Sequence, residues 1–122
     1  MTANWPLHRF HGGIHPPENK TQSTSGPIRQ APLPTLLVVP LLQHIGQPAE
    51  PCVSEGERVY KGQLIALPAG LGAAVHAPSS GIVQRIGAAP YPHASGQTFT
   101  AIEIATDGKD EWHPDIQPAD PA

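Results

Sequence analysis

A repeated pattern between Glu50 and Val83 constrains the fold more than any other part of the sequence. Residues 53–59 (VSEGERV) place apolar residues on both sides of a polar turn that contains glycine, and residues 75–83 (VHAPSSGIV) repeat this arrangement. Glycine supplies the positive φ that tight turns require. Between the two motifs, the short apolar run 63–67 is bounded by a glycine and a proline, which is typical of a strand. We therefore predict two related hairpins that face one another and bury a small β core.

Further short segments extend this interpretation. Residues 35–39, 82–86 and 99–105 have the β-branched or alternating pattern of strands, and residues 88–96 read as a proline-containing loop. The 16 prolines and 12 glycines of the 122 residues have no collagen period. Helical periodicity is almost absent from the chain. The sequence therefore predicts an all-β barrel or sandwich.

The distribution of proline and polar residues predicts three regions. Residues 1–32 are polar and proline-rich, so we expect an extended N-terminal segment. Residues 33–112 hold the strand signals and form the predicted β domain. Residues 113–122 are expected to be a disordered tail, with Trp112 covering the end of the barrel.

Charge and hydropathy disfavour two classes of partner. The formal net charge of −3 comes without a basic patch, so nucleic acid is not an expected partner. The most apolar run, residues 33–42, is too short for a bilayer and contains two prolines. Residues 1–10 also lack the basic and then apolar start of a signal peptide. We expect no direct membrane insertion, and any membrane association must come through a partner.

The residue types that often carry chemistry have simpler interpretations here. Cys52 is the only cysteine, and we expect it to be a buried, inert packing residue. His8, His11 and His15 have the spacing of one helical face, but the glycine and proline pairs nearby disrupt a helix. A plain loop is therefore favoured over a metal site. We expect His44 to be half-buried and hydrogen-bonded.

The acidic residues near the end of the chain do not match a calcium-binding loop. Asp107, Asp110 and Glu111 lack the ligand spacing of an EF-hand. A solvated acidic turn after the last strand is the favoured interpretation. Neither a catalytic nor a metal-binding residue is predicted in this chain.

Several motifs resemble the biotinyl/lipoyl carrier domain, whose fold is a barrel-sandwich hybrid. The resemblance rests on residues 56–59 (GERV), 61–65 (KGQLI) and 75–83. Such carriers present a lysine at the hairpin tip between these motifs, where the cofactor is attached. Here the tip, residues 68–72 (PAGLG), has no lysine, and Lys61 lies in a different turn. The resemblance therefore implies the fold, while the missing amine argues against covalent biotin or lipoate.

A second resemblance covers about residues 10–113. Residues 10–20 (FHGGIHPPENK), 43–46 (QHIG), 91–96 (YPHASG) and 107–112 (DGKDEW) are similar to the N-terminal domain of RnfC, a component of the Rnf electron-transport complex. This resemblance implies a peripheral subunit at the cytoplasmic face of the bacterial inner membrane, within an NAD:ferredoxin oxidoreductase coupled to ion transport. The full subunit is expected to bind FMN, NADH and two 4Fe-4S clusters. None of these cofactors can be assigned to a residue of this chain.

The resemblance implies a non-catalytic structural and docking domain. Its expected partners are the remainder of the same subunit and other Rnf subunits. Two alternatives remain: a biotin- or lipoate-type carrier domain, and a domain that binds NADH or FMN directly. The candidate docking surface combines part of the N-terminal segment with the hairpin tip: Gly12, Gly13, His15, Pro16, Pro17, Gly70, Leu71 and Gly72.

Overall fold

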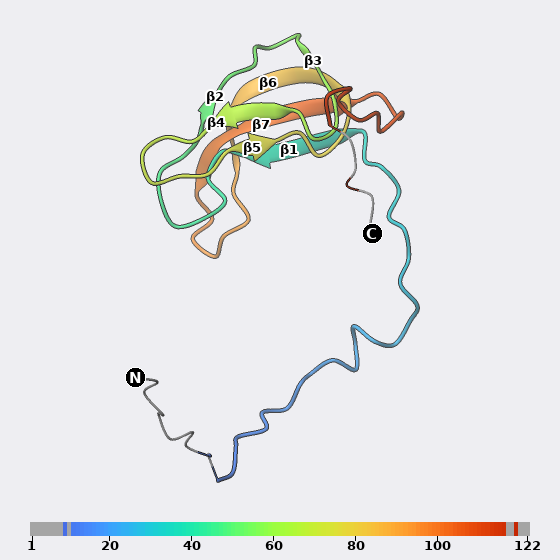
Figure 1. The fold of residues 1–122 in the computed structure, drawn as a ribbon, viewed down its shortest axis with the longest axis vertical. Helices are drawn as coiled ribbons and strands as arrows, with labels where there is room; N and C mark the ends of the chain where they lie inside the picture. Colours follow the sequence, from blue (N-terminus) through green and yellow to red (C-terminus); the bar gives the residue numbers. More distant parts are fainter. Residues whose placement is uncertain (1–8, 10, 117–118, 120–122) are drawn as a thin grey trace, which may run out of the picture. The chain divides into compact units, whose positions relative to one another are not determined.

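The chain forms two units in the computed structural model, which describes residues 9, 11–116 and 119. The first unit is Met1–Ala31 and the second is Pro32–Ala122. In the first unit, the described residues are exposed and contain no strand or helix (Figure 1). One local turn occurs there, in which the Lys20 carbonyl accepts hydrogen bonds from the amide and the hydroxyl of Thr24 at 2.9 and 2.8 Å. The described residues of the segment are otherwise extended, as the prolines predict.

The second unit is built from short antiparallel strands in two sheets (Figure 1). The first sheet has the order β1-β7-β6-β3, and the second has the order β2-β4-β5. The strands are β1 (Leu36–Pro40), β2 (Glu50–Pro51), β3 (Arg58–Val59), β4 (Leu64–Leu67), β5 (Val75–His76), β6 (Gly81–Pro90) and β7 (Thr98–Thr106). The described residues contain no helix, which confirms the all-β prediction.

The core lies between the two sheets and is made of small and β-branched side chains. Ile65 of β4, Val83 of β6, and Ile102 and Ile104 of β7 are fully buried. Ile102 and Ile104 are two residues apart on β7, so their side chains point to the same face of the sheet. Burial of four such side chains stabilises the domain by roughly 1.5–3 kcal/mol each before the entropy cost is subtracted. The core is thus the main source of stability in a unit that has few aromatic residues.

The two repeated motifs pair with each other, which corrects the predicted pair of local hairpins. Arg58 lies opposite Ile82 and Val59 opposite Gly81, so β3 of the first motif pairs with β6 of the second. The Val83 amide also donates to the Glu57 carbonyl at 2.9 Å. Each motif alone has too few residues to form a two-stranded core. When the two motifs pair, their strands become part of one sheet.

Strand β6 is longer than the sequence predicts. Residues 88–90 belong to β6, not to a loop, and Ala89 is buried opposite Phe99. Pro90 is the last residue of the strand, a position where its missing N–H can be tolerated. The hairpin is closed by the Tyr91 amide, which donates to the Gln97 carbonyl at 3.0 Å. The connecting loop is therefore limited to residues 91–97.

The free edge of β6 beyond its pairing with β3 is covered by side chains. The Ile86 amide donates to Glu55 Oε1 at 2.8 Å, and Arg85 donates to the Ala88 carbonyl at 3.1 Å. Arg85 also forms an ion pair with Glu103 of β7. Side chains that occupy edge groups in this way hinder the addition of a further strand.

The chain beyond β7 folds back onto the domain as far as Ile116. Lys61 donates its amide to the Glu111 carbonyl at 2.9 Å and accepts the His113 amide at 3.0 Å. The His113 ring packs edge-on against Tyr60, with 6.0 Å between centroids. Trp112 lies beside this contact and is 50% exposed. The tail predicted from residue 113 therefore begins with a segment in which His113 and Ile116 contact the domain, and most of residues 117–122 lie outside the described part.

The part of the chain that the structure describes contains no helix with the length and hydropathy that crossing a bilayer requires.

Candidate functional site

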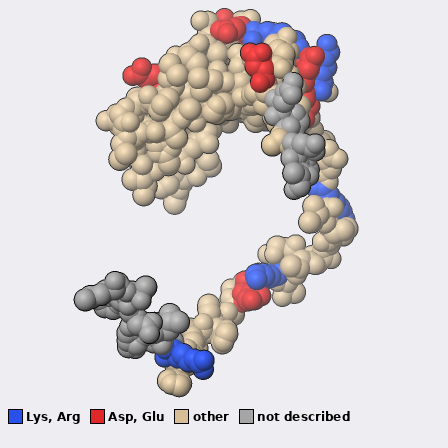
Figure 2. Space-filling view, in the orientation of Figure 1, with Lys and Arg blue, Asp and Glu red and all other residues tan. Residues whose placement is uncertain are grey.

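Three loops at one end of the β domain contain no charged side chain. They are residues 41–49 after β1, residues 68–74 between β4 and β5, and residues 91–97 between β6 and β7. The loops lie together at the left of the domain in Figure 1. In Figure 2 one red side chain lies at the left edge of the domain, the surface below it is free of red and blue atoms, and most of the charged side chains of the domain gather at its other end. We call the three loops the uncharged end.

Two of these loops are joined by hydrogen bonds. The Gln47 amide donates to the Leu71 carbonyl at 3.0 Å, and the Ala73 amide donates to His44 Nε2 at 3.1 Å. His44 is exposed, not half-buried as the sequence predicts, but it is hydrogen-bonded as expected. These bonds fix residues 69–73 against residues 44–47, so the tip has a defined shape.

The glycines of the tip serve this internal contact. A Cβ atom at Gly72 would lie 2.8 Å from the Ala69 carbonyl oxygen and 3.1 Å from that of Gln47. A Cβ atom at Gly46 would overlap the Leu71 carbonyl oxygen. Gly70 also packs near the Gln47 side chain. The sequence indicates that Gly70 and Gly72 allow sharp folding or close approach to another surface, and in the structure the close approach is within the domain.

Two large aliphatic side chains project from the joined loops. Ile45 is 100% exposed and Leu71 is 81% exposed. Together with His44, Gly72 and Ala73 they line a shallow hollow of about 220 Å³. A larger open groove of about 370 Å³ lies beside it, between residues 47–51, Leu41, Ala69 and Thr100. Both hollows are open to solvent, which suits contact with another surface.

The other predicted docking residues belong to the first unit. Gly12, Gly13, His15, Pro16 and Pro17 are all exposed in an extended segment. No atom lies within 4 Å of the position of a Cβ at Gly12 or Gly13. The two halves of the predicted docking surface therefore fall in separate units of the chain. Phe10, which opens the motif, and His8 of the histidine trio lie outside the described residues.

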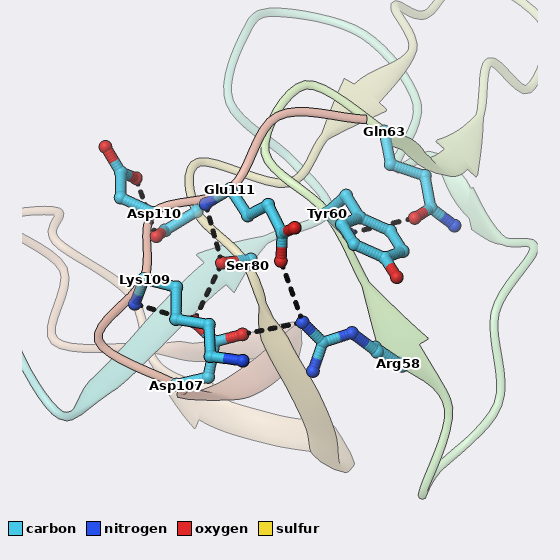
Figure 3. A network of polar contacts seen from close by, with 9 residues as sticks. Arg58, Tyr60, Gln63, Ser80, Asp107, Lys109, Asp110 and Glu111 are labelled. Atoms are coloured by element: carbon cyan, nitrogen blue, oxygen red, sulfur yellow. Dashed lines mark hydrogen bonds and ion pairs between the residues drawn. The ribbon is translucent and has the colours of Figure 1, made fainter. Parts of the chain in front are cut away.

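The sequence did not reveal a polar network at the other end of the β domain (Figure 3). Ser80 donates its hydroxyl to Asp107 Oδ1 at 2.8 Å and accepts the Glu111 amide at 2.8 Å. Arg58 forms ion pairs with Asp107 at 2.9 Å and with Glu111 at 3.2 Å. The Arg58 guanidinium also lies 5.0 Å from the centre of the Tyr60 ring. This half of the network joins β3, the turn before β6, and the segment after β7.

The neighbouring serine repeats the arrangement. Ser79 donates to Asp110 Oδ1 at 2.8 Å, and Lys61 pairs with Asp110 Oδ2 at 2.5 Å. The Lys61 ammonium lies 4.9 Å from the centre of the Trp112 ring. Both Ser79 and Ser80 are fully buried. Buried hydroxyls need partners, and each serine has an aspartate as its acceptor.

The network lowers the pKa of both aspartates. For Asp107, the Lys109 backbone amide and the Ser80 hydroxyl stabilise the charged carboxylate, followed by Arg58, and hold its pKa below the ordinary value of 3.8. For Asp110, the hydrogen bonds from Lys61 and Ser79 lower the pKa in the same direction. Both carboxylates are therefore ionised and occupied at neutral pH. The hydrogen-bond partners of each carboxylate stabilise its charged form.

Two interpretations of these residues need correction. The acidic turn was predicted to be solvated, but it is part of an ordered network, because the buried Ser79 and Ser80 donate hydrogen bonds to its carboxylates. Cys52 was predicted to be buried, but it is exposed, with Sγ 3.7 Å from the Leu64 carbonyl oxygen. Its neighbour Val53 occupies the core position instead, at 8% exposure. For the polar network, the available sequence signal was the pair of adjacent serines at 79 and 80, followed by the spaced acids at 107 and 110.

The donor sets of the chain bear on metal and cofactor chemistry. The described residues hold no group of three His, Cys, Asp or Glu side chains that could bind a metal. The single cysteine of the chain does not fit a 4Fe-4S cluster, which takes four thiolates. The uncharged end has no Lys or Arg to pair with the phosphates of FMN or NADH. These residue sets do not fit the cofactors expected for the full subunit.

Comparison with known proteins gives a consistent result. Residues 8–109 match the family described as the RnfC barrel sandwich hybrid domain. A protein of Pseudomonas aeruginosa, named as the C component of an ion-translocating oxidoreductase complex, is 59% identical over 107 residues, which are 87% of this chain. Proteins of the same name from Cronobacter sakazakii and Pectobacterium carotovorum are 47% and 48% identical over 103 residues, or 84% of this chain.

The matched relatives are much longer than this chain. The aligned region spans 14% of the Pseudomonas protein, 13% of the Cronobacter protein and 14% of the Pectobacterium protein.

Proposed function

Because this chain belongs to the RnfC barrel-sandwich hybrid domain family, we propose that it is the non-catalytic docking domain of the RnfC component of an ion-translocating oxidoreductase complex. It contributes to electron transport as part of the full subunit. Its partners are the remainder of that subunit and other Rnf subunits. The site of action is the cytoplasmic face of the bacterial inner membrane, which the domain reaches through the complex.

One observation supports docking above the alternatives. The tip between β4 and β5, where related carriers present a modified lysine, here presents Leu71 on a backbone fixed by Gln47 and His44. A swinging carrier arm needs an exposed amine, and this tip has none. A fixed apolar tip is suited to a permanent contact. FMN, NADH and the iron–sulfur clusters are accordingly assigned to the remainder of the subunit.

Coexpression tests the proposal. The chain and the remainder of the Pseudomonas aeruginosa subunit, beginning after its aligned region, are produced as two polypeptides with a tag on one. We expect them to copurify as a 1:1 complex on size-exclusion chromatography. Separate elution of two folded polypeptides, with no association detected by titration calorimetry, would contradict docking.

The two alternatives are tested with the purified chain alone. Intact mass spectrometry reports a covalently attached biotin or lipoate as added mass, and we expect the unmodified mass. Titration with NADH or FMN is expected to show no saturable binding. An added prosthetic group would instead support a carrier domain, and saturable binding of either cofactor would support a direct cofactor site.

A further inference from the structure

The uncharged end points to one kind of partner, an inference that rests on the proposed docking function. We infer that the uncharged end seats an uncharged, apolar surface of the remainder of its own subunit. Ile45 and Leu71 are the two projecting contacts. An aliphatic or aromatic side chain of the partner fills the shallow hollow between them.

The exposure of Ile45 and Leu71 is the first reason to assign a contact surface here. Single exposed aliphatic residues are common on protein surfaces and need no explanation. Ile45 and Leu71, however, come from two loops that are hydrogen-bonded to each other, and both line the same hollow. They are exposed to 100% and 81%. Neither side chain is buried enough to add much to the stability of the domain, whereas both are placed to bury area against a partner.

The fixed shape of the two loops is the second reason. The amide of Gln47 and the amide of Ala73 both make hydrogen bonds across the two loops, at 3.0 and 3.1 Å. Gly46 and Gly72 permit the close backbone approach that these bonds require. A surface that is already ordered loses little conformational entropy on binding. The hollow therefore exists before a partner arrives.

Charge selects the chemistry of the partner. Residues 41–49, 68–74 and 91–97 contain no Lys, Arg, Asp or Glu. An anionic lipid surface or a nucleic acid gains its affinity from basic side chains, which this end lacks. The centre of a protein interface is depleted of charge in the same way. An uncharged protein surface is the complementary partner.

Two facts favour the same subunit over a second copy of the chain. The matched relatives are about seven times longer than the aligned region, so a large partner surface is covalently attached at high effective concentration. Self-association through the edge of β6 is hindered, because Glu55 and Arg85 occupy its backbone groups.

The experiment compares Ile45→Asp and Leu71→Asp with the control Ile28→Asp. Ile28 is also fully exposed but lies in the first unit. Each variant is titrated against the separately produced remainder of the Pseudomonas aeruginosa subunit, and its thermal unfolding is recorded. We expect each tip variant to weaken binding at least about tenfold, the Ile28→Asp variant to bind like the unchanged chain, and all three to unfold at the same temperature.

The possible outcomes test the proposed contact surface and the proposed docking function separately. If the unchanged chain binds the remainder and the tip variants bind equally well, the docking function stands, but the assignment of the contact to the uncharged end is wrong. If the unchanged chain does not bind the remainder at all, the proposed function fails first. Concentration-dependent dimerisation that Leu71→Asp abolishes would overturn the choice of partner. Cosedimentation with phosphatidylglycerol vesicles, lost in the same variant, would also overturn it.

Discussion

The hydroxyl of Ser80 donates a hydrogen bond of 2.8 Å to Asp107 and so joins the turn before β6 to the segment after β7 (Figure 3). The two residues are 27 positions apart in the sequence. Ser80 is fully buried and also accepts the amide of Glu111. One hydroxyl therefore satisfies two polar groups at the charged end of the domain.

Replacing Ser80 by Ala should destabilise the domain. The change removes both hydrogen bonds and leaves the Glu111 amide without its partner, at a cost of about 1–3 kcal/mol. Urea unfolding followed by circular dichroism measures this loss. Ser95→Ala, at an exposed serine, is the matched control and should change the free energy of unfolding by less than about 0.5 kcal/mol. An unchanged midpoint for Ser80→Ala would show that the network is dispensable.

Acid should unfold the domain through the two aspartates. The pKa values of Asp107 and Asp110 are lowered in the folded state below their ordinary 3.8, so the unfolded chain binds protons first as the pH falls. Their stabilisation is full above about pH 5 and is lost below about pH 4, through the lowered folded values. Urea midpoints between about pH 3 and pH 7 should show this decline. The decline should be shallower in Asp107→Asn, and an equally steep decline would refute the assignment.

Core and tip substitutions should differ sharply in their effect on stability. Ile65 is fully buried between the sheets, so Ile65→Ala is expected to cost about 2–5 kcal/mol. Leu71 is exposed, so Leu71→Ala should change the free energy of unfolding by less than about 0.5 kcal/mol. Thermal or urea unfolding of both variants provides the comparison. A large loss for Leu71→Ala would mean that the tip supports the fold.

His44 should order the tip without supporting the whole domain. His44→Ala removes the acceptor of the Ala73 amide, whereas His44→Gln can retain an acceptor. Hydrogen exchange at Ala73 is expected to be faster in the alanine variant and closer to the original rate in the glutamine variant. The Ile104 amide in the core is the internal reference and should be unaffected. Equal exchange at Ala73 in all three proteins would exclude the proposed bond.

Local patterns were sufficient to predict the class of the fold and several strands. The apolar run at Leu64–Leu67 and the alternation near Thr98–Thr106 became β4 and β7. The partners of the two motifs were not predictable in the same way. Turn residues indicate where a chain reverses but do not determine which of several compatible strands it pairs with. The resemblance to the RnfC family is confirmed by the match over residues 8–109.

The site was predictable only in part. The motif itself drew attention to Leu71 and its glycines, but Ile45 was missed because a single aliphatic residue in a loop has no pattern. The pairing of Ser79 with Asp110 depends on contacts over 31 residues, which no local rule predicts. Cys52 was assigned to the core because free cysteines are usually buried, but its neighbour Val53 is the buried residue.

The bond from the Thr106 amide to the Thr35 carbonyl, at 3.0 Å, places the entry to β1 beside the exit from β7. Adjacent strand ends let a longer polypeptide continue from both without crossing the domain. The chain therefore enters and leaves the sheet of the β domain on one side, and the uncharged end lies on the other side (Figure 1).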